Sequence, residues 1–143
     1  MAKTVRDAMT ADPRTTSPTA SLADAAQIMK TEDVGSVPVV DDGRLVGMLT
    51  DRDIALRAVA EGVDAQAINV GDVASRDPVT VAPEQDLDEA LRLMAGHQVR
   101  RLPVVEDGRL VGILAQADVA LEAKGKKTGE VLEGISKPGS RGA

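Results

Sequence analysis

The chain has 143 residues and a formal net charge of −6, from 17 basic and 23 acidic side chains. A chain of this length can form one domain, or two small halves that share a core. The acidic balance argues against a general nucleic-acid binder and against a protein of anionic membrane surfaces, because both need a basic face to neutralise phosphates. We therefore expect neither nucleic acid nor a membrane among its partners.

The residue types that the chain lacks exclude further kinds of binding site and catalytic chemistry. The chain contains no Phe, Tyr or Trp, which excludes base stacking on aromatic platforms. It contains no cysteine, and His97 is its only histidine, so disulfides, thiol nucleophiles and Cys-rich or His-rich metal sites are excluded. The N-terminal residues form no apolar signal segment, and no apolar stretch approaches the length of about 18 residues that spans a membrane. We expect a cytoplasmic protein without a metal site.

An internal repeat organises the sequence. A shift of 65 positions lays residues 5–56 over residues 70–121 without a gap. The longest identical block is residues 42–47 against residues 107–112. Two copies, unlike the many copies of a solenoid, indicate a pseudo-twofold pair that shares one core.

Each copy begins with a short helical lead-in, at residues 5–9 and 70–74, which an Asp-Pro pair ends. A brief extended piece is expected next, at residues 14–16 and 79–81. An amphipathic helix follows, at residues 22–30 and 87–95, because apolar residues recur there at positions i, i+3, i+4 and i+7. Ser21 and Asp86 are the expected caps of these helices, and Met29 and Met94 are expected in the core.

A β-branched run follows in each copy, at residues 37–40 and 102–105, and a second apolar run comes after it, at residues 44–49 and 109–114. The Asp-Gly pair between the runs of each copy predicts a tight β-hairpin. A second helix is expected at residues 51–60 and 116–123. The fold is therefore α/β (α+β), with the order β-α-β-β-α in repeat 1 (residues 5–60) and again in repeat 2 (residues 70–123). Residues 124–143 are expected to form a partly disordered tail.

This element order resembles that of the cystathionine β-synthase (CBS) domain. The phrases Val-Pro-Val-Val-Asp-Asp-Gly-Arg-Leu-Val-Gly at residues 37–47 and Gly-Met-Leu-Thr-Asp-Arg-Asp-Ile at residues 47–54 carry the same resemblance. Two such domains in tandem make the pair called a Bateman module. The resemblance covers about residues 5–123, and the layout is similar to that of stand-alone actinobacterial CBS-pair proteins.

The segment with the clearest chemistry begins where the second strand of repeat 1 gives way to its helix. Thr50 places a hydroxyl at the start of that helix, where unpaired backbone N–H groups can hold an anion. Asp53 offers two acceptors that suit a ribose diol. The same pair is also a plain capping box, which satisfies two backbone donors without a ligand. The resemblance favours the ligand, because in CBS pairs this hydroxyl and carboxylate contact the ribose of adenine nucleotides.

The second copy lacks part of this arrangement. Ala115 stands in place of Thr50, and Ala117 stands in place of the cation Arg52. Asp118 keeps the carboxylate and can still cap its helix. This asymmetry predicts one competent site and one degenerate site, and sequence drift is an equally simple explanation of it.

Repeat 2, in contrast, carries two basic residues that repeat 1 lacks. Arg100 and Arg101 lie at the start of the middle strand of repeat 2, where repeat 1 has Gly35 and Ser36. The resemblance implies that strands of the other copy line the base and phosphates of a ligand bound at the Thr50 segment. The residues implied are Thr80, Val81, Val99, Arg100 and Arg101. Because adjacent strand residues point to opposite faces, at most one of the two arginines is expected to grip a phosphate.

The expected function is that of a regulatory CBS pair that binds an adenosine-containing ligand such as AMP, ADP or ATP in one cleft between the repeats. The alternative is a ligand-free interaction module that acts through an unidentified protein partner, which the missing aromatics and Ala115 favour. No nucleophile-base pair or cofactor fingerprint is visible, so no enzymatic activity is expected. A homodimer is expected, because both second helices add apolar residues beyond those that cover each sheet. These residues are Ile54, Ala55, Ala58, Val59, Val119, Ala120 and Ala123.

Overall fold

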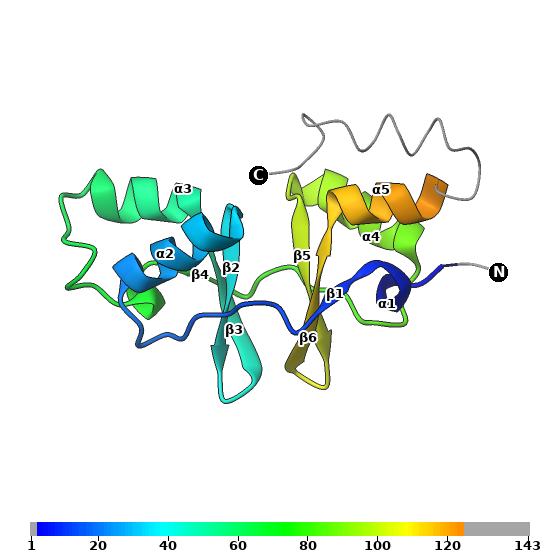
Figure 1. Cartoon of the computed structure of the whole chain (residues 1–143), viewed down its shortest axis with the longest axis horizontal. Coiled ribbons are helices and arrows are strands. Elements are labelled where there is room, and N and C mark those ends of the chain that lie inside the picture. The colour runs from blue at the N-terminus through cyan, green and yellow to red at the C-terminus, as the bar shows by residue number, and fades with distance from the viewer. Residues whose placement is uncertain (1–2, 125–143) are drawn as a thin grey trace. The chain divides into compact units, whose positions relative to one another are not determined.

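The computed structural model describes the backbone of residues 3–124 and the side chains of residues 3–121. Within these residues the chain forms two compact units (Figure 1). The repeat 1 unit consists of residues 14–78 and 108–110, and the repeat 2 unit consists of residues 3–13, 79–107 and 111–124. The tail expected at residues 124–143 lies, apart from Lys124, outside the described residues.

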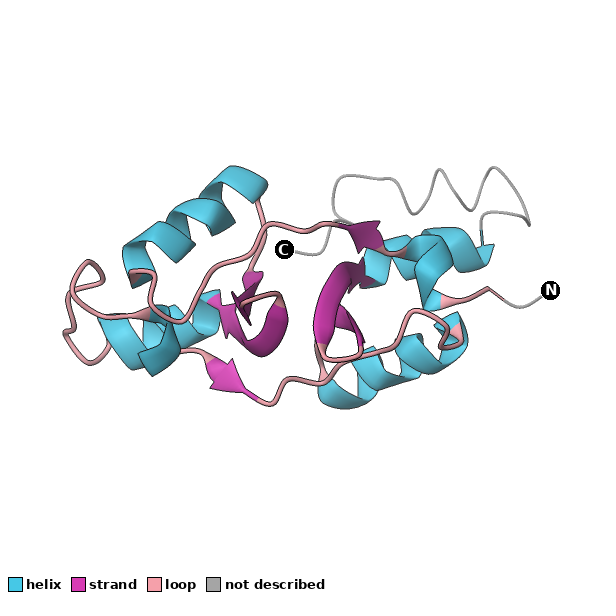
Figure 2. Ribbon diagram, turned by 90° about the horizontal axis from the view of Figure 1, so that it is seen from below, coloured by secondary structure: helices cyan, strands magenta, loops and turns pink. Residues whose placement is uncertain are grey.

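The repeat 1 unit is built around an antiparallel hairpin. Strands β2 and β3 pair along their length, and the two-residue strand β4 pairs with the other edge of β3, with Gly47 opposite Arg76 and Met48 opposite Ser75. The helices of the unit lie beside these strands (Figure 2). Its elements are α2 (Leu22–Glu32), β2 (Ser36–Asp41), β3 (Arg44–Thr50), α3 (Asp51–Ile54), the π-helical turn η1 (Ala55–Val59), the 3-10 turn η2 (Val70–Asp72) and β4 (Ser75–Arg76).

The repeat 2 unit has the same plan. Strand β5 pairs with β6, and the two-residue strand β1 pairs antiparallel with β6, with Thr10 opposite Ile113. Helices α4 and α5 pack against each other. The elements of this unit are α1 (Val5–Ala8), β1 (Thr10–Ala11), α4 (Leu87–His97), β5 (Arg101–Glu106), β6 (Arg109–Ala115) and α5 (Gln116–Lys124).

Each lead-in segment packs in the unit of the other repeat. Val5 of α1, which is fully buried, belongs to the core cluster of the repeat 2 unit. Val70 and Val73 belong to the core cluster of the repeat 1 unit. The boundaries expected from the sequence, residues 5–60 and 70–123, follow the repeat, whereas the compact units exchange the lead-ins between the repeats.

The amphipathic helices begin where the sequence predicts and run two residues further than expected. Ser21 caps α2 by accepting a hydrogen bond from the Asp24 N–H at 3.1 Å. Asp86 caps α4 by accepting a hydrogen bond from the Asp88 N–H at 3.2 Å. Both helices end at a residue in the left-handed conformation, Asp33 or Gln98, each with a φ of 56°. This conformation terminates a helix by turning the chain away from its axis.

The hairpin turns confirm the Asp-Gly prediction. Asp42 and Gly43 have φ angles of 52° and 81°, and Asp107 and Gly108 have φ angles of 54° and 80°. Two successive positive φ angles are the requirement of a type I′ turn, whose twist matches that of the flanking strands. The turn chemistry therefore sets the register of both hairpins.

The extended pieces expected at residues 14–16 and 79–81 differ from the prediction. In the structure they provide single parallel bridges, Thr16 to Val39 and Val81 to Val104. The short strands β1 and β4 lie before the Asp-Pro pairs instead. Asp12 and Asp77 adopt left-handed φ angles of 51° and 53°, so the chain turns sharply between each short strand and the bridge that follows.

The cores contain aliphatic and methionine side chains. Met29 and Met94, expected in the core, are 7% and 1% exposed. The two core clusters match each other across the repeat, with Leu22 and Leu87 as one equivalent pair. Among residues 3–124, no helix is both long and apolar enough to cross a lipid bilayer.

The first prediction concerns the contact between β3 and β4. A Cβ at Gly47 would lie 2.6 Å from the carbonyl oxygen of Ser75, so β4 must move to admit it. We expect Gly47→Ala to lower the free energy of unfolding by about 1 to 3 kcal/mol in urea denaturation.

Gly96 in α4 supplies the control, because a Cβ there meets nothing within 4 Å. Gly96→Ala should raise the free energy of unfolding by about 0.5 to 1 kcal/mol, since alanine loses less conformational freedom in a helix. Equal changes for Gly47→Ala and Gly96→Ala would contradict the close approach of β4.

Candidate functional site

A capping box stands at the start of α3. The Asp53 N–H donates to Thr50 Oγ1 at 3.0 Å, and the Thr50 N–H donates to Asp53 Oδ2 at 3.0 Å. Thr50 is extended, with a φ of −115°, as an N-cap residue must be. Thr50 and Asp53 therefore form the capping box that their spacing predicts. The Asp53 carboxylate can accept further hydrogen bonds, because a carboxylate offers about four lone-pair positions.

Two further side chains approach Asp53. The Ser75 hydroxyl lies 3.4 Å from Oδ1 and 3.5 Å from Oδ2, and donates to the carboxylate. Arg57 Nε lies 3.9 Å from Oδ1 and forms an ion pair. The same arginine donates a hydrogen bond to the Val73 carbonyl at 3.0 Å. Asp53 itself is only 9% exposed, so a nearly buried carboxylate is held by three different segments of the chain.

Sequence reasoning missed both of these residues. Arg57 follows Asp53 by four positions, which on a helix predicts an ion pair, and this signal was available. Ser75 lies 22 residues after Asp53, and no local pattern connects the two. Only the pairing of β4 with β3 brings the serine to the carboxylate.

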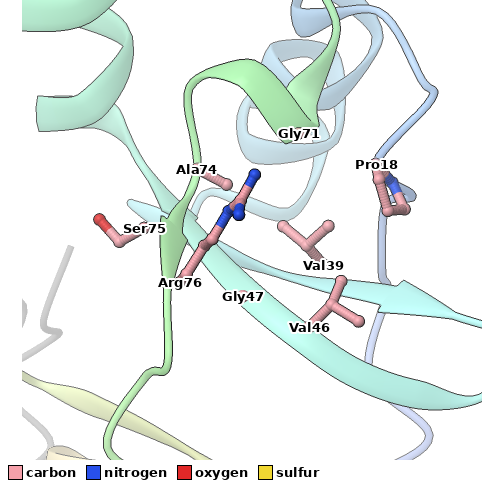
Figure 3. A pocket seen from close by; sticks show the side chains of 8 residues that line it. All are labelled: Pro18, Val39, Val46, Gly47, Gly71, Ala74, Ser75 and Arg76. Carbon is pink, nitrogen blue, oxygen red and sulfur yellow. The ribbon is translucent and has the colours of Figure 1, made fainter.

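A pocket of about 300 Å³ lies in the repeat 1 unit beside β4 (Figure 3). Its walls are mostly apolar, and Arg76 is its charged side chain. Figure 3 shows the Ser75 hydroxyl pointing away from the other lining side chains, whereas the Arg76 guanidinium extends toward Gly71. The lining residues are Pro18, Val39, Val46, Gly47, Gly71, Ala74, Ser75 and Arg76.

The residues implied for the base and phosphates belong to the repeat 2 unit. Thr80 and Arg100 are exposed, Arg101 is half-buried at the start of β5, and Val99 is 37% exposed. Val81 differs from the expectation, because its side chain is 2% exposed and packs in the core cluster of this unit. A core side chain has no free face for an adenine base, so the backbone of this residue is all that it can offer a ligand.

Asp118 is placed in the first turn of α5. Burial raises the pKa of this carboxyl above its ordinary value of 3.8, and the positive charge of Arg101 opposes that rise. Within residues 3–121 no hydrogen bond to the Asp118 carboxylate is present, so the expected helix cap is not made. Without the hydroxyl that Ala115 replaces, the first turn of α5 lacks the reciprocal partner found at Thr50.

The structure thus divides the expected site residues between the units. Thr50, Arg52 and Asp53 lie at the start of α3 in the repeat 1 unit, and Arg52 is exposed there. The remaining residues lie in the repeat 2 unit: Thr80, Val81, Val99, Arg100, Arg101 and Asp118. Among the described side chains, no group of three or more His, Cys, Asp or Glu residues could hold a metal ion.

Comparison with known proteins identifies close relatives along nearly the whole chain. The CBS domain-containing protein YhcV of Bacillus subtilis is 46% identical over 133 residues, which cover 92% of this chain and 94% of that protein. Hypoxic response protein 1 of Mycobacterium tuberculosis is 42% identical over 118 residues, which cover 82% of each chain.

Two solved structures show the same fold. The crystal structure of Hypoxic Response Protein I, which holds two coordinated zinc ions, is 41% identical, with a TM-score of 0.77 over 82% of this chain and 97% of that one. The structure of CBSX2 in complex with AMP is 32% identical, with a TM-score of 0.76 over 87% of this chain and 98% of that one.

The CBS domain family matches this chain twice, at residues 5–59 and at residues 70–125. These two matches coincide with the two copies of the internal repeat, as the sequence predicts. This chain therefore belongs to the CBS domain family and carries two CBS domains in tandem.

Proposed function

We propose that this CBS pair is a regulatory, non-catalytic module that senses an adenosine-containing ligand such as AMP, ADP or ATP. The observation that carries the proposal is the Asp53 carboxylate, which is 9% exposed and oriented by a complete capping box. A relative of the same fold, CBSX2, has been crystallised with AMP. The membership of the chain in this family supports the same class of ligand.

The chemistry of Asp53 suits the two adjacent hydroxyls of a ribose. Its two oxygens offer about four acceptor positions, of which the Thr50 N–H occupies one at 3.0 Å and the Ser75 hydroxyl a second. A vicinal diol presents two donors at the spacing of the two carboxylate oxygens. Hydrogen bonds to an ionised acceptor are stronger than neutral ones, so this contact would favour nucleosides over free bases.

One site is proposed rather than two. Ala117 stands where the cation Arg52 stands in the first repeat. Ala115 also removes the hydroxyl that Thr50 supplies in the first repeat. Asp53 is thus the acceptor and Asp118 marks the degenerate copy.

The other contacts rest on the family resemblance. It assigns the phosphates to Arg100 or Arg101, and the base to the region of Thr80 and Val99. Arg52, exposed in the first turn of α3, is a further cation proposed for the ligand. Arginine suits a phosphate because its guanidinium can donate two parallel hydrogen bonds.

Apolar side chains that are exposed on the helical segment after α3 support a homodimer. Leu56 and Val59 are 50% and 71% exposed, and Val63, just beyond the turn, is 38% exposed. We call these three residues the Val59 patch. Of the residues expected on this face, Ala58 is instead 1% exposed and packs in the core. The π-helical turn η1 explains the change, because its wider winding shifts which side chains point outward.

Loss of the Asp53 carboxylate tests the ligand site. We expect Asp53→Ala to abolish the rise in melting temperature that AMP, ADP or ATP causes, and Asp118→Ala to leave most of it. A lost charge-assisted hydrogen bond weakens binding by about tenfold to a hundredfold. Thermal shift at fixed nucleotide concentration measures the difference, since a bound ligand stabilises the folded state by mass action.

Arg101→Ala extends this test to the phosphates, and should weaken AMP far more than adenosine. Equal loss of ligand stabilisation in the two aspartate variants would show that the site is assigned wrongly. If the wild-type protein binds no adenine compound, the ligand-free interaction module remains as the function.

The raised pKa of Asp118 makes stability depend on pH. Because the folded state holds this proton more tightly than the unfolded state, stability falls as the pH rises through the folded pKa, and the loss is complete above it. We expect Asp118→Asn to melt at a higher temperature than the wild type at about pH 7. The difference should vanish as the pH falls below the ordinary value of 3.8.

Asp88→Asn is the matched control for this titration, because Asp88 is an exposed aspartate in the first turn of α4. Asp88→Asn removes a negative charge from the first turn of a helix, as Asp118→Asn does, but from an exposed side chain. An Asp118→Asn difference that stays constant across the pH range, or that appears equally in Asp88→Asn, would refute the role of burial.

The dimer is tested at the Val59 patch. Light scattering of the wild type should report about twice the monomer mass of 14.9 kDa. Val59→Glu should return the protein to the monomer mass, because a charge cannot be buried in an apolar interface without a partner. Val46→Glu is the control, since Val46 is 41% exposed on β3 and lies outside the patch. A wild-type monomer, or dissociation by both variants, would contradict the interface.

A further inference from the structure

Asp53 has more partners than a helix cap requires. The capping box uses Oδ2 alone, through the Thr50 N–H at 3.0 Å. Ser75 adds a donor that lies 3.4 Å from Oδ1 and 3.5 Å from Oδ2. Arg57 adds a positive charge at 3.9 Å from Oδ1. The carboxylate is thereby contacted on both oxygens, and its plane is set by groups outside its own turn.

We propose that Ser75 and Arg57 are positioning residues that hold the Asp53 carboxylate in the orientation that accepts a ribose diol. The inference rests on the proposed function and adds the residues that give the site its preference for ribose over deoxyribose. Neither residue belongs to the segment Gly-Met-Leu-Thr-Asp-Arg-Asp-Ile that carries the family resemblance.

Ser75 is suited to this role by its geometry. Its hydroxyl carries one proton, which can serve only one carboxylate oxygen at a time, and the nearly equal distances of 3.4 and 3.5 Å place it across both. Ser75 pairs antiparallel with Met48, which precedes Thr50 by two residues on β3. This pairing fixes the position of the Ser75 backbone relative to the capping box. The hydroxyl therefore restricts rotation of the carboxylate without using all of its lone pairs.

Arg57 is anchored at a second point. It donates to the Val73 carbonyl at 3.0 Å, which keeps the guanidinium near Oδ1 although the arginine side chain is 55% exposed. The ion pair places a positive charge beside a side chain that is only 9% exposed. Arg57 thus restrains Oδ1 from a point outside the capping box.

The second repeat shows that the fold does not require these partners. At the 65-residue offset, Thr10 corresponds to Ser75, and it pairs with Ile113 as Ser75 pairs with Met48. Glu122, which carries the opposite charge, stands where Arg57 stands in the first repeat. The helix α5 forms in this unit although no hydrogen bond to Asp118 is present within residues 3–121. The additional contacts at Asp53 are therefore specific to the repeat with the complete Thr-x-x-Asp segment.

The experiment measures preference between nucleosides. Calorimetry with adenosine, 2′-deoxyadenosine and 3′-deoxyadenosine gives the ribose preference of the wild type, which we expect to favour adenosine. Ser75→Ala and Arg57→Gln should each reduce that preference by about twofold to tenfold, as the loss of one hydrogen-bonding partner does. Ser75→Thr keeps the hydroxyl and should restore it.

Thr10→Ala is the matched control, because it removes the equivalent hydroxyl from β1 and should leave the ribose preference unchanged. A merely structural role would lower the affinities for all three nucleosides in the same proportion, and the ratio would stay constant. A wild-type ratio that Ser75→Ala and Arg57→Gln leave intact would overturn the positioning role while the proposed function stands. Failure of the wild type to bind adenosine would overturn both.

Discussion

The constraint on which the structure depends is that neither repeat completes a core with its own residues. The chain has no aromatic side chain, so each core must be filled by small aliphatic groups and methionine. Val5 supplies part of the core of the repeat 2 unit, and Val70 and Val73 supply part of the core of the repeat 1 unit. Since close packing of apolar groups is the main stabilising contribution to folding, this exchange makes each unit depend on residues from both repeats.

The exchange of lead-ins also builds the candidate site. The lead-in that contributes Val70 and Val73 continues into β4, which pairs with β3. Gly47 permits that pairing, because a Cβ at this position would lie 2.6 Å from the Ser75 carbonyl. Core packing, strand pairing and a glycine together bring Ser75 to the Asp53 carboxylate.

The two repeats illustrate how one backbone plan carries different chemistry. Asp53 is held by a hydroxyl, a guanidinium and a reciprocal cap, whereas burial raises the pKa of Asp118 and only the charge of Arg101 opposes that rise. Both aspartates follow a β-strand and lie in the first turn of a helix. The difference between them lies in their neighbours, so the position at a helix terminus does not by itself set the environment of the carboxylate.

The sequence by itself determined the family, the repeat, the helices, the hairpins and the Thr50 to Asp53 pair. These features depend on local rules: apolar periodicity, the positive φ angles that an Asp-Gly turn requires, and the spacing of a capping box. Only the tertiary structure decided the exchange of lead-ins, the contact of Ser75 with Asp53 and the burial of Val81. Those features join residues far apart in the chain, and their energies depend on which side chains share a core, which no local pattern encodes.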